Sequence, residues 1–167
     1  TAAGESWSGS SGGWVTARHF LNGTAGESTV RFRFVFASDV TVQFGGLGID
    51  DIYIAPAFNK DLAGSVVAIS SEAEICGSPN EPVTFTFVNL GAQTQSNVQV
   101  AYAVNGGTPV VETVSGPIAP DETRSYTFNT TFDSRDAISV IKCWTNLAGE
   151  FVTTNDSAAY TIDHRPL

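Results

Sequence analysis

Apolar and polar side chains alternate with a period of two along much of this chain. The clearest case is the run 30–36, in which Val30 and three Phe residues share one parity. Successive side chains of an extended strand point to opposite faces, so this row predicts a strand over a hydrophobic core. No stretch shows a helical period with caps, and we expect an all-β protein. Two further strands are predicted at 40–44 and 49–54.

A second series of alternating segments follows an interruption at 55–61 that contains Pro56. Asn105, Gly106 and Gly107 separate two of these segments, and such a sequence is typical of a hairpin turn, whose central residues need positive φ. Short strands at this spacing predict an immunoglobulin-like β-sandwich of about 100 residues. The expected strands are 65–69, 83–88, 98–104, 110–114, 124–128, 138–144 and 160–162.

The interruption divides the chain into a first domain, 1–57, and a second domain, 58–167. The few strands of the first domain are too small a sheet to bury a core of their own. Its apolar face has to be covered either by the sandwich or by strands upstream of Thr1, and we expect the second arrangement. In that case 1–57 does not fold alone, whereas 58–167 does.

Composition narrows the class of protein. The chain has 167 residues, of which 42% are hydrophobic, and this content excludes a disordered chain. Its formal net charge is −9, which argues against nucleic acid and anionic membranes as partners, because phosphate binding depends on clustered Lys and Arg. No apolar run approaches the length of a membrane helix, so we expect no membrane insertion. The sequence contains no Met, and we take it as a piece of a longer, processed protein.

Candidate catalytic residues do not emerge from the sequence. The Gly-rich stretch 9–13 lacks the following Lys of a phosphate loop, and His19 and His164 lie in different segments. We therefore predict no enzymatic activity. Trp7 stands in a Ser- and Gly-rich stretch and is the candidate for stacking on a ligand, whereas we expect Trp14 and Trp144 in the core.

Part of the first domain resembles a known family. Gly13 and Trp14, the run 30–36, and the segment 46–54 with its Ile-Asp-Asp-Ile sequence resemble the C-terminal part of a jelly-roll domain. The domains in question are the MAM and cleaved-adhesin types of secreted bacterial peptidases and adhesins. The resemblance implies that a partial jelly-roll β-sandwich precedes the immunoglobulin-like β-sandwich.

The second domain resembles the immunoglobulin-like modules of type IX secretion cargo proteins. The residues that carry this resemblance are Cys76, Gly77, Glu81 to Thr84, Asn89 to Gly91, Tyr102 to Gly107, Ile118 to Pro120, Tyr126 to Phe128, Asn155 and Asp156. The resemblance implies export by the type IX secretion machinery, a secreted or cell-surface location, and no catalysis within the module. Such cargo normally ends in a sorting domain, and nothing after Asp156 resembles one.

The expected export of the protein affects the redox state of its two cysteines, Cys76 and Cys143. A cysteine pair in an exported domain usually forms a disulfide, and we expect a bridge that joins the two sheets. Closing so long a loop would stabilise the fold by about 4 kcal/mol, because it restricts the unfolded chain. Two buried free thiols are the alternative.

The jelly-roll resemblance also implies a structural calcium ion, with Asp50 and Asp51 as candidate ligands. Calcium takes six to eight oxygen ligands, and two adjacent carboxylates offer several. Successive side chains of a strand point apart, so both could reach one ion only if the strand bends. A solvated pair of capping carboxylates is the alternative.

These expectations together describe a non-catalytic adhesion or spacer module of a large secreted or cell-surface bacterial protein. Its partners would be the upstream domains of the same protein and surface glycans or proteins, which the loops of the sandwich would contact. The alternative is an accessory C-terminal region of a secreted peptidase or glycosidase, whose catalytic domain lies upstream.

Overall fold

The computed structural model describes residues 10–21, 23–24, 26–37, 41, 45–71 and 76–165. The chain divides into two compact units, Thr1–Pro56 and Ala57–Leu167, which we call unit 1 and unit 2. Within the described residues, no helix is long and apolar enough to cross a membrane.

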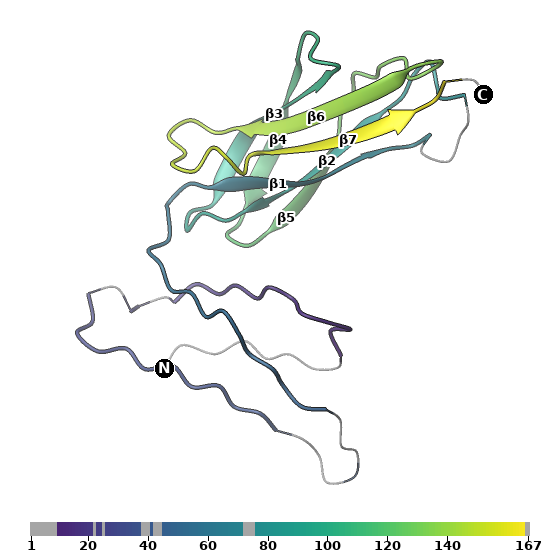
Figure 1. The fold of residues 1–167 in the computed structure, drawn as a ribbon. Coiled ribbons are helices and arrows are strands. Elements are labelled where there is room, and N and C mark those ends of the chain that lie inside the picture. Colours follow the sequence, from purple (N-terminus) through teal and green to yellow (C-terminus); the bar gives the residue numbers. More distant parts are fainter. Residues whose placement is uncertain are drawn as a thin grey trace. The chain divides into compact units, whose positions relative to one another are not determined.

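Unit 2 is a sandwich of two antiparallel sheets (Figure 1). One sheet has three strands in the order β1-β2-β5, and the other has four in the order β4-β3-β6-β7. The strands are β1 (Leu62–Ile69), β2 (Val83–Asn89), β3 (Gln95–Val104), β4 (Val110–Ile118), β5 (Thr123–Thr127), β6 (Ile138–Asn146) and β7 (Ser157–Asp163). All seven strands expected in the second domain are present, so the predicted all-β class and immunoglobulin-like sandwich are confirmed.

Some strands are longer than predicted, because irregular backbone conformations keep the additional residues paired with the neighbouring strand. β4 continues to Ile118 although Gly116 has a φ of 86°. The partner strand β3 accommodates this with a register shift between Ser96 and Val98, where Asn97 has a φ of 53°. An extra residue on one strand of a pair produces a register shift of this kind, called a β-bulge. The alternation of apolar and polar residues along a single strand does not reveal it.

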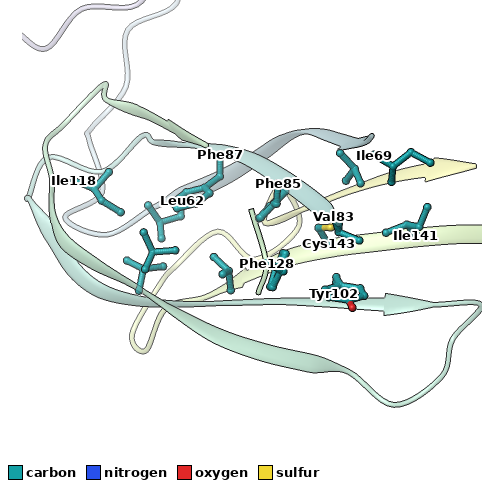
Figure 2. Packing of buried hydrophobic residues seen from close by; sticks show 14 of the residues in the cluster. Leu62, Ile69, Val83, Phe85, Phe87, Tyr102, Ile118, Phe128, Ile141 and Cys143 are labelled. Atoms are coloured by element: carbon teal, nitrogen blue, oxygen red, sulfur yellow. The ribbon is translucent and has the colours of Figure 1, made fainter. Parts of the chain in front are cut away.

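The core of unit 2 lies between the inner faces of the two sheets (Figure 2). Phe85 and Phe87 of β2 are fully buried, and their rings stack with centroids 5.5 Å apart. Ile141 and Cys143 of β6 are equally buried in the opposite sheet. Each large apolar side chain moved out of water stabilises the fold by about 1.5–3 kcal/mol, so this layer supplies most of the driving force for folding.

A buried polar side chain fixes the loop that leads from one sheet to the other. Asn89 is fully buried at the end of β2, and its Nδ2 donates to the carbonyl oxygens of Gln93 and Ile118. Its Oδ1 accepts the N–H of Gly91. A Cβ at Gly91 would lie 2.7 Å from the carbonyl oxygen of Asn59, so the loop packs closely against the residues that enter β1.

Unit 1 contains no β-strand over its described residues. The strands predicted at 30–36 and 49–54 are therefore absent, and most of 40–44 lies outside the described residues. Phe32, Phe34 and Phe36 are exposed, as is Val35 on the other parity. Alternation makes a chain suitable for a sheet, but a strand forms only with a hydrogen-bonded neighbour. The jelly-roll assignment of this segment stays a prediction.

Candidate functional site

The residues predicted to bind calcium lie on an exposed bend of unit 1. Asp51 has a φ of 52°, in the left-handed region, and its N–H donates to Oδ1 of Asp50 over 2.8 Å. Both carboxylates line an open hollow of about 380 Å³ together with the segment 14–17. Trp14 is 78% exposed at this hollow, so its predicted place in a core is wrong. The backbone does bend at the Asp pair, as binding of one ion by both would require.

In the described part of the chain, no three His, Cys, Asp or Glu side chains are arranged to hold a metal ion. The calcium prediction at Asp50 and Asp51 therefore stays a prediction. Trp7, the predicted stacking residue, lies outside the described residues.

The structure has both cysteines as free thiols, so the predicted bridge is not present in it. Cys143 is fully buried on the inner face of β6, and burial raises the pKa of its thiol to about 12. Cys76 is exposed in the connection between β1 and β2. The sequence placed Cys143 correctly in an apolar strand, but it could not show that Cys76 stays outside the sandwich.

A shallow, open groove of about 570 Å³ lies on the outer face of the four-stranded sheet of unit 2. Val140, Lys142 and Trp144 of β6 alternate outward along the groove, because Ile141 and Cys143 occupy the inward positions. Gly106, Gly107 and Pro109 of the β3–β4 hairpin also line it, as do residues at the start of β7. We call this feature the outer groove.

Two alanines of β3 lie beside these larger side chains. Ala101 pairs with Trp144, and Ala103 pairs with Lys142 across the β3–β6 ladder. Directly opposite side chains on one face are about 5 Å apart, so each alanine sits next to a larger neighbour on the same face. Both alanines are buried although they point away from the core. Ala103 lines the outer groove beside Lys142, whereas Ala101 does not line it and is covered by its neighbours.

The outer groove contains an unpaired cation. Arg124, Arg135 and Arg165 of unit 2 each form an ion pair with a carboxylate two residues earlier in the chain. Lys60 donates to the carbonyl oxygen of Ala148. Of the lysines and arginines in the described part of unit 2, Lys142 alone has neither an ion pair nor a hydrogen bond.

A second polar feature lies at the start of β1, where the charge of Asp61 is close to the carboxyl groups of Glu150 and Asp156. Burial, with the Asp156 and Asp61 charges in addition, raises the pKa of Glu150 to about 7 although its Oε1 accepts the N–H of Leu62. Glu150 Oε2, Asn155 Oδ1 and Asp156 Oδ1 are buried without a hydrogen-bond partner. Buried polar atoms without a partner cost folding free energy, so these groups destabilise the fold locally.

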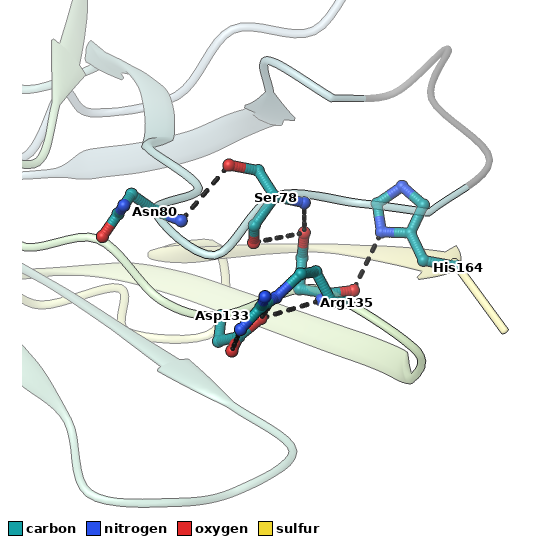
Figure 3. Close-up of polar contacts among 6 residues, drawn as sticks. Ser78, Asn80, Asp133, Arg135 and His164 are labelled. Carbon is teal, nitrogen blue, oxygen red and sulfur yellow. Dashed lines mark hydrogen bonds and ion pairs between the residues drawn. The ribbon is translucent and has the colours of Figure 1, made fainter.

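Histidine is not available as a general base in unit 2. His164 is buried, and its Nδ1 and Nε2 lie 3.0 and 3.1 Å from the carbonyl oxygens of Ser134 and Ser71. Figure 3 shows the Ser134 contact as part of a polar network in which Ser78 is also bonded to Ser134. Since both ring nitrogens face backbone oxygens, the ring ties chain segments together at this end of the sandwich.

Comparison with known proteins places the fold. No protein-family model matches the chain, and no curated protein matches it. Two solved structures of the CARDB domain of the PF1109 protein from Pyrococcus furiosus are similar to it. The crystal structure, a complex with di-metal ions, is 20% identical with a TM-score of 0.50, and the match covers 70% of this chain and 98% of that one. The solution NMR structure is 17% identical with a TM-score of 0.44, over 64% and 95% of the two chains. At this identity the likeness shows the fold alone, an immunoglobulin-like β-sandwich.

The thiols of Cys76 and Cys143 should differ in reactivity. In the native protein, iodoacetamide should modify Cys76 readily and leave Cys143 unmodified, because a buried thiol with a raised pKa forms little thiolate. Mass spectrometry after digestion, with and without prior unfolding in urea, measures both sites. A disulfide-linked peptide in non-reduced protein would contradict this arrangement.

Glu150 should make stability depend on pH. A carboxyl whose pKa is raised from 4.5 to about 7 on folding favours the folded state below pH 4.5, and this contribution is lost as the pH rises through 7. We expect Glu150→Gln to be more stable than the parent by about 1 kcal/mol at pH 8, because the partly hydrated carboxylate feels only part of the burial cost. The difference should vanish at pH 4.5. Urea unfolding of the full chain at both pH values measures it.

Glu112→Gln is the matched control, with the opposite sign. Burial would raise the pKa of Glu112, but hydrogen bonds from Asn129, Thr130 and Tyr126 outweigh it and lower the pKa to about 2. This substitution should destabilise the protein at pH 8, and less so as the pH falls toward 2. Equal effects of the two substitutions at pH 8 would contradict the assignment of their environments.

Proposed function

We propose that the chain is a non-catalytic adhesion module of a large secreted or cell-surface bacterial protein, with unit 2 as its binding part. The single observation that carries the proposal is the outer groove with Trp144 and the unpaired Lys142 on its surface. A side chain such as Trp144 is costly to leave at a surface for structural reasons alone, and aromatic residues dominate the energetics of binding sites.

The arrangement of the described residues supports a role in binding a ligand without reacting with it. The outer groove offers a half-buried indole, an ammonium group, hydroxyl groups, methyl groups, backbone and the carboxyl group of Asp156. These are groups that hold and orient a ligand. Neither Cys143, which faces the core, nor His164, which faces two carbonyl oxygens, reaches it as a nucleophile or base.

Export through the type IX machinery and attachment to upstream domains belong to the same proposal, and they rest on the resemblance of the sequence. The same fold would also serve as a spacer between other domains, and that role needs no ligand. The outer groove favours adhesion over spacing, because a pure spacer does not need a depression lined by an aromatic residue and a free cation.

A glycan and matrix-protein array tests adhesion. The labelled full chain should bind at least one class of ligand, and Trp144→Ala should lose that binding because it removes the aromatic surface of the outer groove. Trp14→Ala is the matched control, since it removes an exposed Trp of unit 1. The bound ligand should be recovered chemically unchanged.

Absence of binding to every class on the array, or equal binding by Trp144→Ala and the parent, would overturn the adhesion proposal. Recovery of a cleaved ligand with pure protein would overturn its non-catalytic part.

A further inference from the structure

The outer groove presents its two distinctive side chains at a fixed spacing. Lys142 and Trp144 are two residues apart on β6 and point to the same face. Strand geometry places the Cα atoms of such residues about 7 Å apart. A ligand that uses both side chains has to carry a flat apolar surface and an anionic group at a matching spacing, and a rigid unit of that size loses the least entropy on binding.

The side chains beside Lys142 leave room for a ligand. Ala103 lies opposite Lys142 and lines the groove, so β3 adds only a methyl group to its floor at this point. Gly107 and Pro109 of the hairpin line the same groove without long side chains. The groove is therefore bounded by short side chains next to the ammonium group.

The charges of the outer groove favour an anion at the Lys142 end. Lys142 has no acidic partner among the described residues, although the chain carries a net charge of −9. The acid of the groove, Asp156, precedes Ser157, which pairs with Trp144, while Lys142 pairs with Ala159. Asp156 is thus on the far side of Trp144 from Lys142. A ligand whose carboxylate lies toward Lys142 avoids it.

We propose that the outer groove binds a carboxylated sugar, with a pyranose ring against Trp144 and the ring carboxylate paired with Lys142. This inference rests on the proposed adhesion function and names its ligand class. A uronic acid carries the carboxylate on the ring itself, so one rigid unit spans the distance between the two side chains. An acidic peptide could supply the same groups only by ordering several rotatable bonds, which costs affinity.

The carboxylate and the pyranose ring of the sugar make separate contributions to the free energy of binding. The aromatic face contributes through burial of the C–H surface of the sugar, which does not depend on salt. The ammonium–carboxylate pair is exposed, so it weakens with ionic strength and adds specificity more than affinity. Acidic sugars should therefore bind better than their neutral counterparts at low salt, and this preference should shrink at high salt.

Isothermal titration of the full chain with oligogalacturonate and with its methyl ester tests the proposal. The two probes share their ring skeleton, and the ester lacks the charge. We expect the acid to bind about threefold tighter than the ester at low salt, which corresponds to about 0.6 kcal/mol, in the range of an exposed ion pair. Lys142→Gln should remove this preference, so that the variant binds the acid and the ester with equal affinity. Lys60→Gln, at the other lysine of the chain, is the matched control and should retain the preference.

Trp144→Ala should abolish binding of both probes. Because Trp144 is half-buried, circular dichroism and urea unfolding establish that this variant is folded, and Trp144→Phe, which keeps an aromatic face, should restore part of the binding.

Four outcomes overturn the inference, and they separate it from the adhesion proposal. Equal affinities for acid and ester would leave a neutral-sugar site and refute the role of the carboxylate. A preference for the acid that survives Lys142→Gln would refute Lys142 as the partner of the carboxylate. No binding of either probe, combined with Trp144-dependent binding of a protein or another glycan on the array, would refute the ligand class but retain adhesion. No binding in either experiment would remove both proposals.

Discussion

Packing of the two inner faces of unit 2 against each other is the constraint on which the rest of this structure depends. Phe85 and Phe87 on one sheet and Ile141 and Cys143 on the other are fully buried, so the parity of β2 and β6 is fixed. A shift of either strand by one residue would turn its apolar row toward water. The outward parity of β6 is fixed by the same packing, and it brings Val140, Lys142 and Trp144 onto one surface. The outer groove is thus a consequence of the core.

Strand alternation in the second half of the chain was enough to predict the sandwich. Seven short segments between Ser65 and Ile162 were predicted as strands, and each is a strand in the structure, where the apolar faces of the two sheets pack against each other. The hairpin at Asn105 and Gly106 was equally clear, since both residues adopt the positive φ that such a turn needs. Local signals were sufficient here because the local pattern and the tertiary packing agree.

The same reasoning failed where the outcome depends on distant partners. The row of Phe residues in 30–36 has the pattern of a strand, but no described segment pairs with it. Whether Cys76 could reach Cys143 depended on the path of the β1–β2 connection, which the sequence does not encode in any short pattern. The outer groove was missed for a related reason. Trp144 and Lys142 were on one parity in the sequence, but the alanines opposite them lie on β3, and only the register between strands brings the four together.

Hydrogen exchange of backbone amides tests most directly the central claim, that unit 2 is a cooperatively packed sandwich and that the apolar rows of unit 1 lack a hydrogen-bonded partner strand among the described residues. Mass spectrometry of the full chain should find β2, β3 and β6 protected to a common level, set by global unfolding of unit 2. Peptides from 30–36 and 49–54 should exchange orders of magnitude faster, because their amides have no ladder to protect them. Protection of 30–36 at the level of β2 would contradict the account.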